Sequence, residues 1–301
     1  MKSDLRILVD PDKSKSITLD KFRANAWEFY GHKENMLSSA DLDKLQKELA
    51  VSHLPEIFFG YNRFYMVNEA INFCYEINPL NMMNLSAFKV RNEFFDKKEI
   101  YYKPNDVKVQ YHKEWKNIKI ERDDIQTIEP VEDWTYSSPY MGNFSSIANS
   151  ELKGLYSGID EDKIFTVKES NKELPIERLG PKNPIVNYVE ISLYEDELND
   201  NGLSETKFRF RVMKDCFFGL LRSYLRVDNV LVRNIDTRIF HSFGDNYIFR
   251  NFQVRESTYE ELSQRGFDLK SSWSINPNQS DILSQFMGEP IFNKSDEIIL
   301  M

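Results

Sequence analysis

Three charged side chains crowd the middle of the otherwise apolar stretch VLVRNIDTRIFH, at residues 230–241. In an extended chain, residues i and i+2 share a face, so Asp236 and Arg238 lie about 7 Å apart on one face while Arg233 and Thr237 point to the other. Asp236 can then hold the Arg238 guanidinium and leave its outer donors free. Such a planar fork suits a carboxylate, which is more typical of peptide recognition than of catalysis. An internal ion pair across a bend explains these charges equally well.

Acidic runs could in principle supply a general acid and a general base. EDE at residues 195–197 and DED at residues 160–162 are the two clusters. Runs of this kind in turns are usually solvated faces. If the protein is an enzyme rather than a binding protein, the carboxylates favour a hydrolase that uses Asp196 or Asp236.

The sequence lacks the motifs that would indicate a metal site or a nucleotide cofactor. None of the four histidines stands in an H-x-H, H-E-x-x-H or Cys/His pattern. DPDKS at residues 10–14 starts like a calcium loop, but Lys15 and Lys21 stand where Gly and a bidentate Glu belong. The sequence contains no G-x-G-x-x-G, Walker A or G-x-S-x-G motif. We therefore expect no metal and no cofactor.

Composition narrows the class of partner. A chain of 301 residues with 41% hydrophobic and 29% charged residues should fold, and its net charge of −9 argues against nucleic-acid or anionic-membrane binding. Cys74 and Cys216 lie in apolar surroundings, which fits a reducing compartment. The sequence has neither an apolar run of about 18 residues nor a signal-peptide core, so we expect a protein of the cytoplasm or the nucleus.

Strand signals dominate the elements that must position these residues. Residues 185–194 and 206–212 alternate apolar and polar side chains, and the turn residues Asn201-Gly202 between them predict an antiparallel pair. Further strands are expected at 229–233, 237–242 and 247–254, a hairpin at 63–67 and 72–77, and weaker strands at 107–111, 133–136 and 163–168.

Helices are expected at three places. Capping signals start helices at Ser39 and at Asn78-Pro79, and Asp215 precedes apolar residues at helical spacing from Phe217 to Leu225. The pattern predicts a single α+β domain, mostly an antiparallel, sandwich-like β-sheet with two or three packed helices. We expect a mobile arm at residues 1–22, a folded domain at 23–265 and a partly ordered tail at 266–301.

Three runs of this sequence resemble a known family. The run from Tyr194 to His241, the EDWTYSSPYMG segment at Glu132–Gly142 and SADLDKLQKELAVSHLPEIFFGYN at Ser39–Asn62 are similar to the signature segments of the TIPRL family. Matching runs extend from about Trp27 to Glu256. Members of this family are TOR-signalling pathway regulators that bind type 2A protein phosphatase catalytic subunits.

The resemblance implies a non-enzymatic regulator in TOR signalling, alongside the alpha-4-type phosphatase-binding protein, with a surface groove for the phosphatase's acidic, aromatic C-terminal tail. Family positions for phosphatase binding fall on Ile159 and Asp236, which match, and on Asn81 and Asn234, which differ from an acidic and an apolar residue in relatives. A chaperone-like holder of immature phosphatase subunits is a further alternative.

The charges of VLVRNIDTRIFH then acquire a role. Arg233 or Arg238 would meet the carboxylates of the tail, and Trp134 or Tyr136 its aromatic side chains. Asp236→Ala is expected to weaken phosphatase binding and to leave the melting temperature nearly unchanged.

Overall fold

Two antiparallel sheets form the body of the protein in the computed structural model, which describes residues 18–49, 53–87, 140–150, 165–267, 269 and 279–300. The five-stranded sheet has the order β1 (Thr18–Ala24), β2 (Trp27–Lys33), β4 (Arg63–Asn68), β5 (Phe73–Ile77) and β6 (Asn143–Ser145). The eight-stranded sheet has the order β3 (Ile57–Phe58), β8 (Ile185–Asp196), β9 (Gly202–Met213), β10 (Cys216–Val227), β11 (Leu231–Ser242), β12 (Tyr247–Thr258), β13 (Phe292–Ile299) and β7 (Thr166–Glu169).

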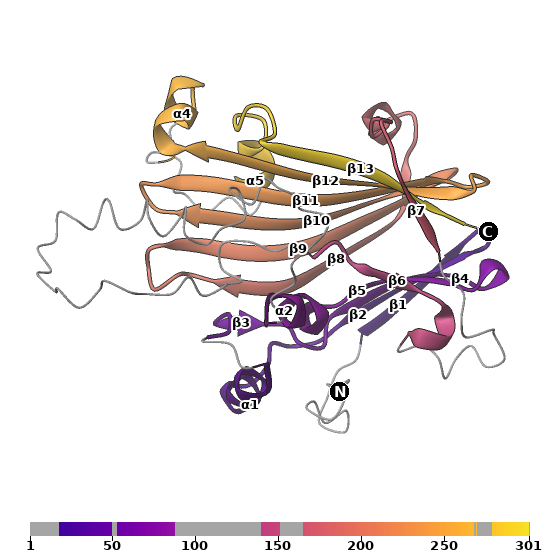
Figure 1. Ribbon diagram of the computed structural model, residues 1–301, viewed down its shortest axis with the longest axis horizontal. Coiled ribbons are helices and arrows are strands. Elements are labelled where there is room, and N and C mark those ends of the chain that lie inside the picture. The colour runs from indigo at the N-terminus through magenta and orange to yellow at the C-terminus, as the bar shows by residue number, and fades with distance from the viewer. Residues whose placement is uncertain are drawn as a thin grey trace, which may run out of the picture.

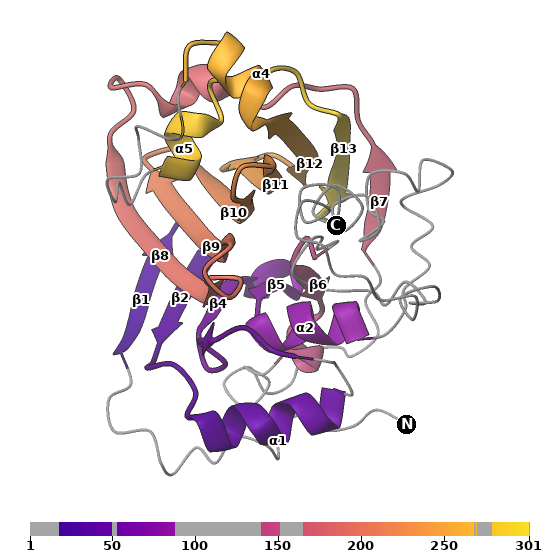
Figure 2. The same cartoon turned by 90° about the vertical axis from the view of Figure 1, so that its left-hand side faces the viewer.

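The helices lie on opposite sides of the eight-stranded sheet. Helices α1 (Ser39–Leu49) and α2 (Pro79–Ala87) lie on the side of the five-stranded sheet, whereas α4 (Tyr259–Gln264) and α5 (Gln279–Leu283) lie on the other side (Figures 1 and 2). We call the sheet face that looks toward the five-stranded sheet the inner face, and the face that carries α5 the outer face.

Aromatic side chains hold the two sheets together. On the inner face, Phe208 and Phe210 of β9 pack against Phe64 of β4, with ring centroids 4.8 and 4.6 Å apart, and Phe29 of β2 lies 5.0 Å from Phe210. All four rings are at most 1% exposed. These rings belong to the largest apolar cluster among the described residues, so the main core lies on the inner face, while the outer face carries smaller apolar clusters and polar groups.

Most of the expected elements are confirmed, as is the mostly antiparallel α+β class. The hairpin at 63–77 is β4 and β5, and the pair at 185–212 is β8 and β9, in antiparallel register. The helix after Asn78 is α2, and the Asn78 Oδ1 accepts the backbone N–H of Leu80 at 2.9 Å. The described residues contain four short α-helices rather than two or three.

The helix expected after Asp215 is wrong, because these residues form β10 in the centre of the large sheet. Both faces of this strand are covered, so apolar residues occur at odd and even positions. Phe217 and Leu221 face the core, while Phe218 and Leu220 face outward. A strand that is apolar on both faces has no period of two, and its apolar residues can fall at helical spacing by chance.

Three other expectations differ from the structure. The two short strands at 229–233 and 237–242 are one strand, β11, because the charged middle has partners on neighbouring strands and needs no bend. Within the expected tail, residues 292–299 form β13 between β12 and β7. Strand β1 begins inside the expected N-terminal arm, whereas residues 1–17 and the strands expected at 107–111 and 133–136 lie outside the described residues.

Candidate functional site

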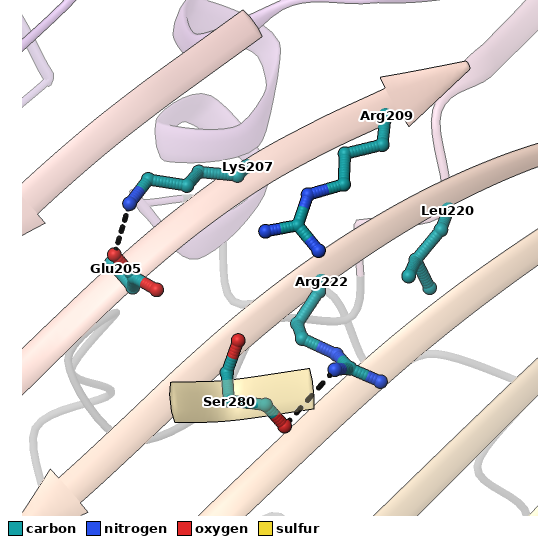
Figure 3. Close-up of a pocket in the computed structure, with 6 residues that line it drawn as sticks. All are labelled: Glu205, Lys207, Arg209, Leu220, Arg222 and Ser280. Carbon is teal, nitrogen blue, oxygen red and sulfur yellow. Dashed lines mark hydrogen bonds and ion pairs between the residues drawn. The ribbon is translucent and has the colours of Figure 1, made fainter. Parts of the chain in front are cut away.

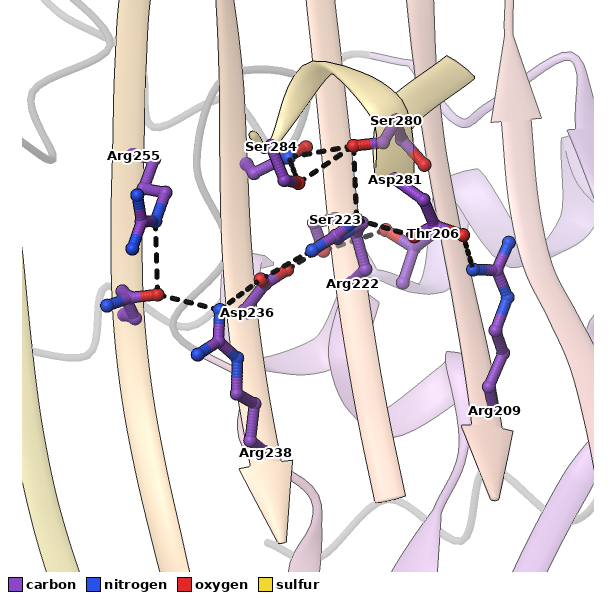
Figure 4. Close-up of polar contacts among 12 residues, drawn as sticks. Thr206, Arg209, Arg222, Ser223, Asp236, Arg238, Arg255, Ser280, Asp281 and Ser284 are labelled. Carbon is purple, nitrogen blue, oxygen red and sulfur yellow. Dashed lines mark hydrogen bonds and ion pairs between the residues drawn. The ribbon is translucent and has the colours of Figure 1, made fainter. Parts of the chain in front are cut away.

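Polar side chains of β10, β11 and β12 form two adjacent rows on the outer face. The strand register places Arg222, Asp236 and Gln253 directly across from one another. The next row contains Leu220 and Arg238. Neighbouring strands lie only about 4.8 Å apart, so these long side chains meet above the sheet. Figure 4 shows them as a connected network that runs on to Arg209.

Asp236 is the centre of this network. The Arg222 guanidinium donates from Nε to Oδ1 and from Nη2 to Oδ2, both at 2.7 Å, and Arg238 Nη2 donates to Oδ2 at 3.1 Å. Asp236 is 2% exposed. Burial alone would raise the pKa of this carboxyl, but the charges and hydrogen bonds of Arg222 and Arg238 lower it below its usual range. Asp236 is therefore ionised and orients two guanidinium groups.

Helix α5 covers one end of the network. Arg222 Nη1 donates to Asp281 Oδ1 at 2.7 Å and to the Ser280 carbonyl at 3.1 Å, and Arg209 binds the other oxygen of Asp281. Beside these contacts lies a small pocket between β9, β10 and α5 (Figure 3). Its lining residues are Glu205, Lys207, Arg209, Leu220, Arg222 and Ser280.

The positive charge at the other end is less compensated. Arg238 Nη2 and Arg255 Nε both donate to the Gln253 Oε1, at 2.7 and 3.2 Å, so two cations share one neutral acceptor. Burial lowers the pKa of Arg255 below its usual range and repulsion from Arg238 lowers it further, against the opposite influence of Glu289 and Asp236. Arg255 forms no ion pair within the described part of the chain. A carboxylate placed here would meet two donors that now share a neutral amide.

We call Arg209, Arg222, Arg238 and Arg255 the arginine cluster. Arg209, Arg222 and Arg238 hold the carboxylates of Asp236 and Asp281, and Glu190 lies 3.3 Å from Arg209 at the edge. Although the whole chain has a net charge of −9, this part of the outer face is positive. The cluster can therefore bind an acidic group of a partner.

The structure brings only some of the expected site residues together. Asp236 and Arg238 share the outer face, as the spacing predicted, and Asn234 lies beside them under α5, where its Nδ2 donates to Ser284 Oγ at 2.7 Å. Arg233 points to the inner face, is 3% exposed and donates to Glu256 at 2.6 Å, so it is not part of the cluster.

The other expected residues lie apart from the cluster or beyond the described residues. Asn81 is half-buried on α2, across the large sheet from the cluster, and its backbone N–H lies 3.4 Å from Asn78 Oδ1. Trp134, Tyr136 and Ile159 are outside the described residues.

Four charged members of the network could not be predicted as site residues. Arg209 stood in an expected strand with no site role, Arg222 stood in the expected helix, and Arg255 followed a strand expected to end at Val254. Asp281 belongs to the expected tail. The sequence does show charged residues within the apolar runs that become β10, β11 and β12. These charges indicate a shared site only once the order of the strands in the sheet is known.

The carboxylates considered for hydrolysis are occupied by structural donors. Asp196 accepts the backbone N–H groups of Leu198 at 2.7 Å and Glu56 at 3.1 Å, which fixes the turn after β8. Asp236 is enclosed by its two arginines. Among the described residues, no group of three His, Cys, Asp or Glu side chains is placed to hold a metal ion. Within those same ranges, no helix has the length and apolar character required to span a membrane.

Together, the fold and the cluster define an α+β protein of two antiparallel sheets with a group of arginine side chains on its outer face. A model of the TIP41-like family matches residues 57–263. The chain therefore belongs to the TIP41-like family, which confirms the resemblance seen in its sequence motifs.

Relatives from distant organisms agree with this assignment. A TIP41-like protein of Dictyostelium discoideum is 31% identical over 234 residues, which cover 78% of each chain. A human TIP41-like protein is 30% identical over 236 residues, covering 78% of this chain and 76% of the relative. The protein named type 2A phosphatase activator TIP41 in Saccharomyces cerevisiae is 30% identical over 253 residues, covering 79% of this chain and 63% of the relative.

Proposed function

We propose that this protein is a non-enzymatic regulator that binds the catalytic subunits of type 2A-like protein phosphatases. The names of two relatives support this role, since the Saccharomyces cerevisiae protein and a Schizosaccharomyces pombe protein, 25% identical over 245 residues, are both called type 2A phosphatase activators. The proposal places the protein in the cytoplasm and in TOR signalling, with the alpha-4-type protein as a further partner, as the family resemblance implies.

The arginine cluster is the proposed binding site for the C-terminal tail of the phosphatase. The observation that carries this assignment is the convergence of Arg238 and Arg255 on the neutral Gln253 amide. A tail carboxylate would replace the amide oxygen as the acceptor for both guanidinium groups. Charge-assisted hydrogen bonds of this kind contribute about 1.5–3 kcal/mol each, so the exchange favours the bound state.

In this proposal Asp236 acts through its neighbours. It is too deeply buried to meet a partner directly, but it fixes the positions of Arg222 and Arg238. A change at Asp236 would then disturb tail binding by releasing these arginines. Asp236 matches the residue type of the family pattern at this position. That match is expected if Asp236 positions the arginines, just as it is expected if Asp236 contacts the partner.

Titration of the purified protein with a purified type 2A phosphatase catalytic subunit tests the proposal. Arg255→Glu should weaken binding at least tenfold, because it places a negative charge where the tail carboxylate would lie. Lys47→Glu changes the net charge by the same amount on the exposed side of α1 and should bind like the unchanged protein. Equal affinities of the Arg255→Glu and Lys47→Glu proteins would contradict the assignment.

A further inference from the structure

The beginning of β8 exposes a group of apolar side chains. Ile185, Val186 and Tyr188 are 51, 52 and 48% exposed, whereas Val189 and Ile191 of the same strand are at most 4% exposed in the core. Among the described residues, β3 is the only strand that pairs with the free edge of β8, and it reaches only Tyr194 and Glu195. Exposed apolar groups of this size at the edge of a sheet are typical of an interaction surface.

A positive charge lies next to these side chains. Arg211 of β9 is directly across from Tyr188 and is half-buried. It forms no ion pair with any carboxylate in the ranges that the structure describes, unlike Arg209 on the same face, which binds Asp281 and Glu190. We call Ile185, Val186, Tyr188 and Arg211 the β8 edge patch. Its composition fits an apolar side chain accompanied by an acidic one.

The β8 edge patch is continuous with the arginine cluster. The Tyr188 hydroxyl donates to Glu190, and Glu190 in turn contacts Arg209 of the cluster. Four strand spacings separate β8 from β12, which carries Arg255. At about 4.8 Å per spacing this is roughly 19 Å across the strands. The strand register aligns Tyr188 with Phe249, four residues before Gln253 on β12, so the diagonal from Tyr188 to the Gln253 amide is roughly 23 Å, the length of an extended peptide of about seven residues.

We infer that the β8 edge patch binds the same phosphatase segment, at a point about seven residues before the carboxyl terminus that the arginine cluster holds. The tail would cross β12, β11, β10 and β9 with its terminal carboxylate at Arg238 and Arg255, and an upstream apolar residue would pack on Val186 and Tyr188. An acidic residue beside it would pair with Arg211. This inference rests on the proposed function and adds a direction and a minimum length to it.

Two synthetic peptides separate the inference from the proposed function. One has the sequence of the last four residues of a type 2A phosphatase catalytic subunit and the other that of the last fourteen, both with a free carboxyl terminus. Isothermal titration with the full chain should give tighter binding of the longer peptide. Val186→Asp and Arg211→Glu should each weaken the longer peptide at least fivefold and leave the shorter one unchanged. Met36→Asp is the matched control, since Met36 is 57% exposed and precedes α1 on the far side of the sheet.

The other possible results of these titrations distinguish failure of the β8 edge patch from failure of the proposed function. If both peptides bind equally well and neither substitution matters, the β8 edge patch has no role and the proposed function stands. If the longer peptide binds more tightly but the Met36→Asp protein is weakened as much as the Val186→Asp protein, the added contact is not at this edge. If neither peptide binds the unchanged protein, tail recognition itself fails and the inference fails with it.

Discussion

At the scale of single residues, the Asp236 carboxylate combines deep burial with two cationic partners. Its 2% exposure leaves no route for water to replace the carboxylate as the acceptor for Arg222. Breaking a buried pair costs about 3–5 kcal/mol, and Arg222 would keep only the more exposed Asp281 as a charged partner. The sequence alone suggested that Asp236→Ala would leave the melting temperature nearly unchanged, and the structure changes that expectation.

Asp236→Ala should lower the free energy of unfolding by about 3–5 kcal/mol, because Arg222 stays buried without its main partner. Urea denaturation followed by circular dichroism measures this change. The double variant Arg222→Met/Asp236→Leu removes both charges and should recover most of the loss. A decrease below about 1 kcal/mol for Asp236→Ala would show that the pair is less buried than described here.

His241 predicts a dependence of stability on pH. Its Nδ1 lies 2.8 Å from the Tyr247 carbonyl and must donate to it, so Nε2 accepts the Trp27 indole N–H at 3.2 Å. A protonated ring would lose the second bond. Burial lowers the pKa of His241 below its usual value, against the opposite influence of the Tyr247 carbonyl. The unfolded chain therefore binds the proton more readily than the folded chain.

The contribution of His241 is fully present above pH of about 6.5, the value for an unfolded histidine, and is lost as the pH falls toward the lower folded pKa. Between pH 7.5 and pH 5.0 the unchanged protein should therefore lose more stability than the His241→Gln protein. Glutamine keeps a donor and an acceptor but does not titrate. Parallel stability curves for the two proteins would contradict this account.

At the scale of elements, β10 shows how closely the strands of the large sheet pack. Gly219 lies across from Ile239 of β11, and a Cβ at Gly219 would come within 2.5 Å of Ile239 Cγ1 and 3.2 Å of Phe208 Cζ. The backbone conformation of Gly219 does not require glycine, because its φ is not positive. The absence of a side chain lets the inner face of β10 accept Ile239.

Gly219→Ala should destabilise the protein by about 1–3 kcal/mol through overpacking of the core. Ile239→Ala removes the nearest atoms and is itself destabilising because it leaves a cavity. The double variant should lose less stability than the sum of the two single variants, since the new methyl group fills part of that cavity. A strictly additive result in urea denaturation would show that the two sites do not touch.

The same strand explains what could be predicted from the sequence. Strands with one core face and one wet face, such as β9, reveal themselves by alternation, and turns reveal themselves by Asn-Gly. Strand β10 does not, because both of its faces are covered by other elements. The opposite orientations of Arg233 and Asp236 followed from local geometry alone. Their partners Glu256 and Arg222 depend on strand order and register, which no local pattern specifies.

At the scale of the whole molecule, charge is distributed unevenly. The net charge of −9 disfavours unselective binding of polyanions, whereas the arginine cluster creates a positive region on the outer face. Helix α5 limits this region at one side through Asp281, and β8 limits it at the other. This arrangement suits a short acidic peptide better than an extended polyanion.

The central claim is that the arginine cluster recognises the carboxyl terminus of another protein. Isothermal titration should compare the last fourteen residues of a type 2A phosphatase catalytic subunit with the same peptide amidated at its end. The account predicts at least tenfold weaker binding of the amidated peptide, because the charge-assisted bonds to Arg238 and Arg255 contribute about 1.5–3 kcal/mol each. The Arg238→Ala/Arg255→Ala protein should lose this preference. Equal affinity of the unchanged protein for both peptides would contradict the account.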